Sequence, residues 1–169
     1  FLADVNGDKR ADVVGFGNAG AYLALSTGKG FAPAQRVIDT FGYEAGDWRV
    51  ELHPRFLADV DGDKRADVVG FGNAGAYLSL STGTGFMPPK QVTGTYGSKA
   101  GGWLVDRNPR ALADVTGDGR ADIVGFGTAA VYVSLSNGAG FGTPEAIAQD
   151  MVYDQGWRVP AHPRLIADV

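Results

Sequence analysis

The repeated stretch on which the fold depends reads Phe56-Leu-Ala-Asp-Val-Asp-Gly-Asp-Lys-Arg-Ala-Asp-Val-Val-Gly-Phe-Gly-Asn-Ala-Gly-Ala-Tyr77. It holds a short apolar segment, an aspartate-rich loop, a second apolar segment, a glycine turn and the start of a third apolar segment. The same stretch occupies residues 1–22 with Asn6 in place of Asp61, and a more divergent copy occupies residues 111–132. Its first residues return as Leu165-Ile-Ala-Asp-Val169. The chain is therefore a tandem repeat, and the repeated unit determines the architecture.

The repeat period indicates the fold class. The aspartates of the Ala-Asp-Val element lie at Asp4, Asp59, Asp114 and Asp168, at intervals of 55, 55 and 54 residues. This period is too long for most helical solenoids and is close to that of a four-stranded propeller blade. In the second unit, apolar alternation predicts strands at 56–60, 66–71, 76–81 and 91–96. No segment has a sustained helical period, so we predict an all-β chain, a β-propeller of four-stranded antiparallel blades.

The repeats also define the expected organisation of the chain. Blade repeats are predicted at residues 1–55, 56–110 and 111–164, with the first strand of a further repeat at 165–169. Three blades do not close a propeller, and an open arc exposes apolar blade faces and strand edges. Because the C-terminal segment duplicates the first strand, we expect it to complete a blade across a subunit boundary, in a homodimer that forms a six-bladed ring. The alternative is that the chain is a fragment of a longer propeller or an engineered repeat, since the first two units differ at only three positions between residues 1–31 and 56–86.

Composition excludes several classes of protein. Hydrophobic residues make up 44% of the chain, which disfavours disorder. A net charge of -4 and a pI near 5.0 disfavour nucleic acid as a partner, because phosphate binding needs a basic face. The absence of cysteine excludes disulfides and thiolate metal sites, and no apolar run is long enough to predict a membrane span. We expect an extracellular or recombinant protein.

The aspartate loops have the spacing of a cation site. Each loop offers oxygen ligands at its positions 1, 3, 5 and 9 and a backbone carbonyl at position 7, as in the first part of an EF-hand loop. The candidate ligands are Asp59, Asp61, Asp63, Arg65 and Asp67 in the second loop, Asp4, Asn6, Asp8, Arg10 and Asp12 in the first, and Asp114, Thr116, Asp118, Arg120 and Asp122 in the third. We predict structural Ca²⁺, best held by the second loop because Asn6 and Thr116 each remove a charge from the other two. The alternative is an Asx turn in which the aspartates bind only backbone amides.

A second repeated motif lies in the connections between the fourth strand of one unit and the first strand of the next. Around Trp157 it reads Gly-Trp-Arg-Val-x-x-His-Pro-Arg, and around Trp48 it is the same except that Asp47 separates the glycine from the tryptophan. Around Trp103 the motif is kept except that Leu104 replaces the first arginine and Asn108 replaces the histidine. The spacing from Trp to His or Asn is five residues in all three connections. In a blade this connection and the turn between the second and third strands share one face, and the aspartate loop lies on the other. The Trp48 connection should therefore approach residues 73–77 of the next blade.

Together these motifs carry a family resemblance. The Asp-x-Asp-Gly-Asp-x-Arg-Ala-Asp loop followed by Val-Gly-Phe-Gly-Asn-Ala-Gly resembles the FG-GAP repeats of integrin-like β-propellers. With Ala-Tyr-Leu-Ser-Leu-Ser and the Trp motif, the whole unit is similar to the family of the fungal Psathyrella velutina lectin and its bacterial relatives. The resemblance implies a seven-bladed propeller, Ca²⁺ in some blade loops, and sugar sites between consecutive blades that favour N-acetylglucosamine. This chain departs from that pattern in having only three full units.

The residue types at the predicted inter-blade sites suit a sugar. An indole face packs against sugar C–H groups, His and Arg donate to hydroxyl or acetamide oxygens, and turn amides beside alanine allow close approach. The first site comprises Trp48, Arg49, His53, Arg55, Asn73, Ala74, Gly75 and Tyr77; the second comprises Trp103, Asn108 and Arg110 facing residues 128–130; the third comprises Trp157, Arg158, His162 and Arg164, with Asn18, Gly20 and Tyr22 of a second chain. We expect the second site to be weaker, because Leu104 and Asn108 replace Arg and His.

Each of these residues has a structural alternative. The tryptophans can be blade-packing core, the His-Pro-Arg segment can simply fix the entry to the next strand, and Tyr22, Tyr77 and Tyr132 can be core residues. For function, we predict a non-enzymatic, multivalent lectin for N-acetylglucosamine-terminated glycans. The alternative is an integrin-like adhesion propeller that binds protein without binding sugar. An enzyme is disfavoured, because the chain has two histidines and no cysteine and no nucleophile–base pair recurs at a consistent position.

Overall fold

The computed structural model describes residues 1–166 as three four-stranded antiparallel sheets, each in simple sequence order. We call them blade 1 (β1–β4), blade 2 (β5–β8) and blade 3 (β9–β12). The strands are β1 Leu2–Ala3, β2 Asp12–Gly17, β3 Gly20–Ala24, β4 Gln35–Ile38, β5 Arg55–Ala58, β6 Asp67–Phe71, β7 Ala76–Ser79, β8 Lys90–Thr93, β9 Arg110–Ala113, β10 Asp122–Phe126, β11 Val131–Ser134 and β12 Glu145–Ala148. One short 3-10 turn, η1 at Tyr153–Gln155, is the only helical element in this range. The all-β fold of four-stranded antiparallel blades is confirmed.

Pairing registers repeat from blade to blade. Gly15 pairs with Tyr22, Gly70 with Tyr77 and Gly125 with Tyr132, and each third strand has a register shift just before that tyrosine. The fourth strand ends sooner than the alternation predicted, at Thr93 rather than at residue 96. The physical reason is that Tyr96 takes a left-handed backbone conformation (φ 63°) and turns fully into the interior. Phe41 has the same geometry in blade 1.

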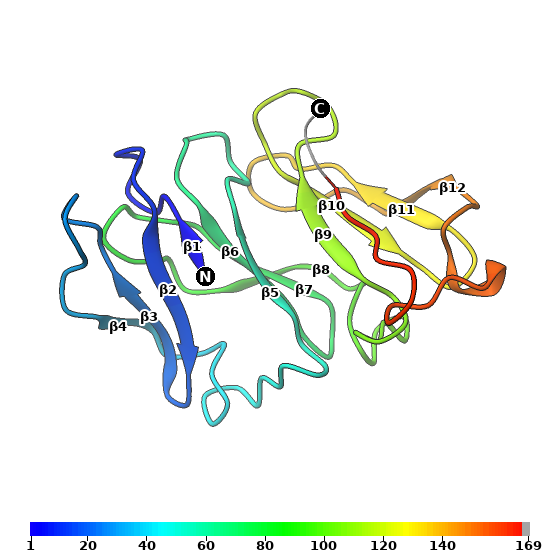
Figure 1. Ribbon diagram of the computed structural model, residues 1–169, viewed down its shortest axis with the longest axis horizontal. Coiled ribbons are helices and arrows are strands. Elements are labelled where there is room, and N and C mark those ends of the chain that lie inside the picture. The colour runs from blue at the N-terminus through cyan, green and yellow to red at the C-terminus, as the bar shows by residue number, and fades with distance from the viewer. Residues whose placement is uncertain (167–169) are drawn as a thin grey trace.

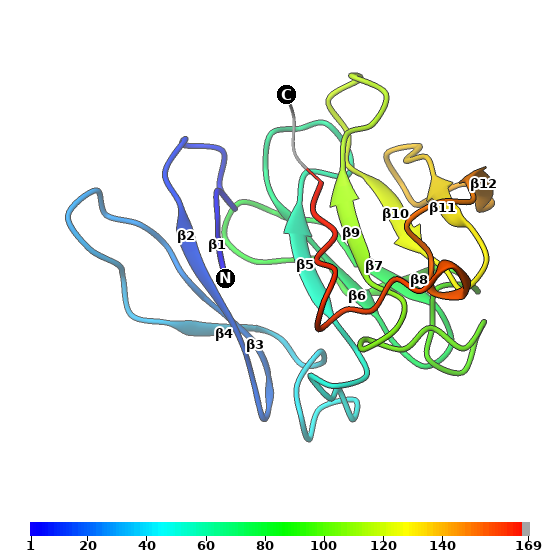
Figure 2. The same ribbon diagram turned by 45° about the vertical axis from the view of Figure 1, so that its right-hand side comes forward.

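The three blades lie side by side, with blade 1 at one end and blade 3 at the other (Figure 1 and Figure 2). The turns that carry the aspartates lie along the upper edge in Figure 1, and the connections of residues 39–54 and 94–109 run along the lower edge. Within the described residues, no helix is long and apolar enough to cross a membrane. The arrangement therefore separates the two repeated motifs onto opposite edges of the blades.

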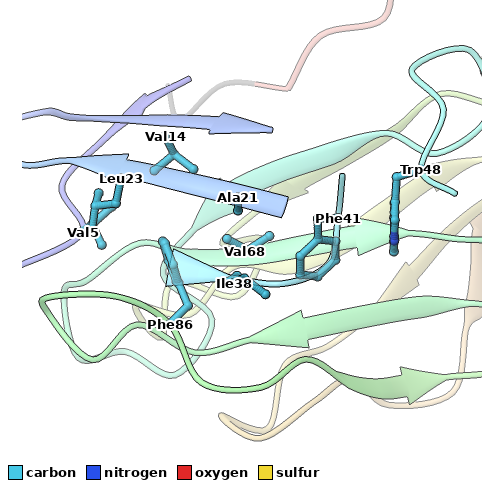
Figure 3. Packing of buried hydrophobic residues seen from close by; sticks show 9 residues of the cluster. All are labelled: Val5, Val14, Ala21, Leu23, Ile38, Phe41, Trp48, Val68 and Phe86. Atoms are coloured by element: carbon cyan, nitrogen blue, oxygen red, sulfur yellow. The ribbon is translucent and has the colours of Figure 1, made fainter. Parts of the chain in front are cut away.

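The hydrophobic core lies between blades rather than inside one sheet. Figure 3 shows Val68 and Phe86 of blade 2 among side chains of blade 1 such as Val14 and Leu23. The same arrangement joins blades 2 and 3, where Ile123 and Phe141 of blade 3 enter the core of blade 2. Because each blade covers the open side of the one before it, every interface repeats the same contacts.

Hydrogen bonds across each interface repeat as well. The amide of Ala66 donates to the Asp4 carbonyl and that of Ala121 to the Asp59 carbonyl, both at 2.7 Å. The hydroxyl of Ser81 donates to the Val5 carbonyl at 2.6 Å, and Ser136 donates to the Val60 carbonyl at 2.7 Å. These bonds fix each blade to the aspartate loop of the blade before it.

The C-terminal segment lies partly outside the described residues. Leu165 is exposed, and Ile166 packs against the core of blade 3 (Val124, Phe126 and Val133), the place that Leu57 takes against blade 1. Residues 167–169, which include Asp168 and most of the predicted strand at 165–169, lie outside the described residues. The three sheets span residues 2–38, 55–93 and 110–148, and the exact repeat boundaries at 55, 110 and 164 stay a prediction.

Candidate functional site

A pocket of about 340 Å³ lies where blade 1 meets blade 2. Blade 1 supplies Trp48 and His53 from its outgoing connection, and blade 2 supplies Asn73, Ala74 and Tyr77 from the turn and start of β7. These are five of the eight residues predicted for the first site, so the structure brings the Trp motif and the turn of the following blade together. The remaining three, Arg49, Arg55 and Gly75, are placed elsewhere.

Trp48 is both a pocket wall and a packing residue. Its side chain is 8% exposed, and its ring lies 4.8 Å from Phe41 and 5.9 Å from Tyr77 between ring centroids. The far end of the indole covers Gly70, where an added Cβ would lie 2.7 Å from its Cη2 atom. The indole therefore holds blades 1 and 2 together while one part of it borders the pocket.

His53 is almost fully buried and is held in one orientation. The Arg49 amide donates to its Nδ1 atom at 3.1 Å, so the neutral ring carries its proton on Nε2. Within the described residues Nε2 has no hydrogen-bond partner. An unpaired buried donor at the edge of a pocket is costly, by roughly 1–3 kcal/mol, unless a ligand or water supplies an acceptor.

The two arginines of the first motif have structural contacts. Arg49 donates to the Tyr43 carbonyl at 2.6 Å, stacks 3.6 Å from the centre of the Tyr43 ring and pairs with Asp47. Arg55 lies over the Phe16 ring of blade 1 at 5.1 Å, and burial lowers its pKa. Gly75 shapes the turn instead of facing the pocket, since an added Cβ would lie 1.9 Å from the Thr93 carbonyl oxygen.

The second pocket, of about 290 Å³, repeats the arrangement between blades 2 and 3. It is lined by Trp103 and Asn108 on one side and by Thr128, Ala129 and Tyr132 on the other. Asn108 donates from Nδ2 to the Phe126 carbonyl and to the Thr128 hydroxyl, both at 3.4 Å. The group that replaces His53 thus donates within the protein, and the weaker second site stays a prediction.

Arg110, predicted for the second site, lies behind it. Its side chain is 4% exposed, donates to the Tyr96 carbonyl at 2.9 Å and lies 5.5 Å from the centre of the Phe71 ring. Burial lowers its pKa to about 10. Arg164 repeats this role at blade 3, with a bond to the Met151 carbonyl at 3.0 Å and the Phe126 ring at 5.4 Å.

In the part of the chain that the structure describes, no turn of a following blade faces the third motif. Trp157 is partly exposed and His162 is exposed, although their counterparts Trp48 and His53 are buried. Arg158 donates to the Tyr153 carbonyl and stacks on its ring, as Arg49 does with Tyr43. Asn18 is exposed and Tyr22 partly exposed on the far side of blade 1, and Gly20 shapes its turn as Gly75 does. Within one chain the two predicted halves of this site do not meet.

Sequence reasoning missed several lining residues. Thr40, Gly46 and Pro89 line the first pocket, and Thr95, Gly101 and Pro144 take the same places in the second. Members of each pair lie one repeat period apart, so the period itself was the signal that could have identified them. They were overlooked because threonine, glycine and proline in connecting segments are usually explained by turn chemistry alone.

The aspartate loops form tight turns closed by their own carboxylates. Asp59 accepts from the Gly62 amide at 2.7 Å and from the Lys64 amide at 2.7 Å, and Asp4 and Asp114 bind the equivalent amides. Asp67 accepts from the amides of Val60 and Ser81, and Asp12 and Asp122 do the same in their blades. The Asx-turn alternative therefore describes part of what these residues do.

The second loop also gathers carboxylates at one point. Oxygen atoms of Asp59, Asp61 and Asp67 lie within 4.8 Å of one another. Burial, with added repulsion from Asp61 and Asp63, raises the pKa of Asp67 to about 7, and burial also raises the pKa of Asp61. Oxygen ligands at this spacing suit a hard cation. The raised pKa of Asp67 fits such a site as well, because a bound cation would offset the repulsion between the carboxylates.

The fifth-position aspartates have a cationic partner already. Arg10, Arg65 and Arg120 pair through their guanidinium groups with Asp8, Asp63 and Asp118 in their own loops. In the first loop the Asn6 amide also donates to Asp8 at 3.0 Å. At position 3 of the third loop, the Thr116 hydroxyl bonds to Asp114. Among the described residues, the three-carboxylate cluster occurs in the second loop.

Comparison with known proteins defines the class of the fold. Residues 59–125 match the FG-GAP-like repeat family. The chain therefore consists of β-propeller blades and contains FG-GAP-like repeat sequence. No curated protein matches the chain.

Two solved structures are similar to this chain. An Agrocybe aegerita lectin, described by its specific recognition of non-reducing terminal N-acetylglucosamine, superposes with a TM-score of 0.95 at 44% identity. The match covers 99% of this chain and 42% of the lectin chain, so this chain spans less than half of that lectin. A chain of the Photorhabdus luminescens Tc holotoxin pore superposes with a TM-score of 0.60 at 23% identity, over 93% of this chain and 7% of that one. The second similarity concerns the fold alone.

Proposed function

We propose that this protein is a lectin that binds N-acetylglucosamine-type sugars in the pockets between adjacent blades, without enzymatic activity. The observation that carries the proposal is the first pocket, where an indole edge, a turn with a small alanine and a buried histidine converge, and where the histidine N–H has no partner among residues 1–166. The indole offers an apolar wall for sugar C–H groups, and the Ala74 side of the pocket offers space for an acetamide methyl. Similarity to the Agrocybe aegerita lectin supports the choice of an N-acetylated sugar.

The proposal includes Ca²⁺ as a structural ion. The cluster of Asp59, Asp61 and Asp67 supports a cation in the second loop, on the opposite edge of the blade from the connection that carries Trp48 and His53 (Figure 1). The ion would hold together the turn that receives Ala121 and Ser136 of blade 3. Its contribution is to the stability of the blades and not to sugar contact.

The proposal also includes multivalency through self-association. Two copies would combine six blades, three from each. Weak individual pockets on one ring would then act together on a glycan-coated surface, because the second binding event becomes intramolecular.

Calorimetric titration with N-acetylglucosamine, and with glucose as the matched sugar that lacks the acetamide, tests the proposal. We expect heat with the first sugar and much less with the second. Ala74→Phe places a ring in the first pocket at an exposed turn position, and Ala129→Phe does so in the second; each should remove one site per chain. Ala139→Phe, at another exposed turn, is the control.

Two results would overturn the proposal. One is the absence of heat with any N-acetylated sugar, which would favour the adhesion alternative. The other is an unchanged number of sites in both pocket variants.

A further inference from the structure

A hollow of about 360 Å³, which we call the outer hollow, adjoins the first pocket between blades 1 and 2. Its walls are residues 37–40, at the end of β4, and residues 86–89, which precede β8. Thr40 and Pro89 line both the first pocket and the outer hollow, so the two spaces adjoin. Two other lining residues, Ile38 and Phe86, belong to the core between these blades (Figure 3). The outer hollow is therefore built by two neighbouring blades of one chain.

Apolar side chains that the blade interface does not need form one wall of the outer hollow. Met87 is 50% exposed, and Pro88 beside it is exposed as well. At the equivalent places between blades 2 and 3 the chain has Gly142 and Thr143, so neither apolar side chain is required for joining two blades. A methionine beside a proline offers an adaptable apolar surface against which a ligand can pack.

Thr40 differs from its counterpart at the second interface in the partner of its hydroxyl group. There the Thr95 hydroxyl shares a hydrogen bond with the Thr93 hydroxyl at 2.8 Å, and Thr93 also accepts from the Thr95 amide at 3.3 Å. Ile38 stands in the place of Thr93 in blade 1 and has no polar group to offer Thr40. The Thr40 hydroxyl is therefore available to a ligand that extends from the first pocket into the outer hollow.

A carboxylate in the wall of the outer hollow restricts the charge of a ligand. Asp39 lines the hollow, and its side chain is 84% exposed and pairs with the Arg36 Nε atom at 3.0 Å. Gly94 takes its place at the second interface. Because a carboxylate accepts hydrogen bonds from hydroxyl groups and repels anions, the outer hollow suits a neutral ring that carries hydroxyls.

We propose that the outer hollow is a second sugar subsite, which binds the neutral ring linked to the N-acetylated sugar in the first pocket. It combines a mostly apolar lining with a few polar groups, as ligand sites do. The first pocket therefore prefers a chain of sugars to a single sugar. The second pocket, with Gly94, Gly142 and Thr143 along the same path, does not distinguish them. This inference rests on the proposed function, because it needs a sugar in the first pocket.

Calorimetric titration with N-acetylglucosamine and with its dimer, N,N′-diacetylchitobiose, tests the subsite. Each pocket is measured alone, in Ala129→Phe for the first and in Ala74→Phe for the second, because each change fills the other pocket. In Ala129→Phe the dimer should bind roughly fivefold more tightly than the monomer, as expected of one added hydrogen bond with some apolar contact. In Ala74→Phe the two sugars should bind equally.

Met87→Ala, combined with Ala129→Phe, should lower the ratio of dimer to monomer affinity toward one. The monomer affinity should stay the same, since Met87 lines the outer hollow and not the first pocket. Val50→Ala in the same background is the matched control, because Val50 is 74% exposed and lines neither space. Circular dichroism confirms the folding of each variant.

Three results would contradict parts of this account in different ways. Equal affinities of monomer and dimer in Ala129→Phe, or a ratio that Met87→Ala leaves unchanged, would overturn the subsite and leave the first pocket as a site for one sugar. The same dimer preference in Ala74→Phe would also overturn it, because the preference would not depend on the outer hollow. No heat with either sugar in wild type would overturn the proposed function and the subsite together.

Discussion

Among individual residues, the pair His53 and Asn108 distinguishes the two internal pockets. Both are almost fully buried and both accept a bond from the backbone amide four residues earlier. They differ in their remaining side-chain donor. The Nε2 atom of His53 has no partner in the described structure, whereas the Nδ2 atom of Asn108 donates to the Phe126 carbonyl and the Thr128 hydroxyl. An exchange between them keeps the local fold and changes the donor available to a ligand.

His53→Asn should weaken sugar binding at the first pocket by about five- to tenfold, since one hydrogen bond contributes about 1 kcal/mol. Asn108→His is the matched reverse change and should strengthen the second pocket. Calorimetry of wild type should give two classes of internal site, and His53→Asn should merge them. Equal affinities before and after the exchange would contradict a ligand contact at this position.

Arg110 is a residue whose role only the structure reveals. The sequence places it beside Asn108 in a motif that suits sugar binding, yet its guanidinium is buried against Phe71 and the Tyr96 carbonyl. The sequence motif could not show this, because the Tyr96 carbonyl lies 14 residues and the Phe71 ring 39 residues before Arg110 in the sequence. Propeller blades can thus use the same arginine for packing that a sugar site would use for recognition.

Arg110→Ala should lower the free energy of unfolding by about 2–3 kcal/mol, because it leaves the buried Tyr96 carbonyl without a donor and opens a void over Phe71. Arg36→Ala, which removes an exposed pair with Asp39, should change stability by less than about 0.5 kcal/mol. Urea denaturation measures both. A similar effect for the two variants would argue against an anchoring role for Arg110.

Among structural elements, the strands followed from the sequence and the connections did not. Apolar alternation and the repeat period locate the first three strands of a blade to within two residues. The fourth strand stops early because Tyr96 leaves the sheet to fill the space between blades. Likewise, the meeting of Trp48 with residues 73–77 follows from blade topology, whereas Thr40 and Pro89 depend on how the connection curls.

The aspartate loop of blade 2 is the element in which we expect Ca²⁺ to act. A ligand at one hundred times its Kd stabilises by about 2.7 kcal/mol, and each kcal/mol shifts the melting temperature of a chain this size by about 2–4 °C. Chelator should therefore lower the melting temperature by several degrees. Asp61→Asn, which reproduces Asn6 of the first loop, should reduce that response.

Asp39→Asn, at a side chain that is 84% exposed outside the loops, is the control and should respond to chelator as wild type does. Differential scanning calorimetry with and without Ca²⁺ measures the shifts. If chelator did not change the melting temperature of wild type, the Ca²⁺ site would be contradicted. The carboxylates would then only close the turn through their hydrogen bonds to backbone amides.

For the molecule as a whole, stability should depend on protein concentration. If copies associate as proposed, the contact would cover exposed side chains such as Phe31 and Ile147, and dilution would favour separated chains by mass action. The melting temperature of wild type should therefore rise with concentration. A concentration-independent transition in wild type, followed by scanning fluorimetry over a wide dilution series, would contradict assembly.

The outer faces of blades 1 and 3 expose different residues, so copies that met through these faces would join head to tail. Head-to-tail contacts of this type close only when the rotation accumulated over the chain divides a full turn, and otherwise grow into a helical filament. Between neighbouring blades the far end of an indole lies over a glycine, Trp48 over Gly70 and Trp103 over Gly125. A side chain larger than glycine at either position would push the two blades apart, so these two contacts limit the angle at which one blade follows the next.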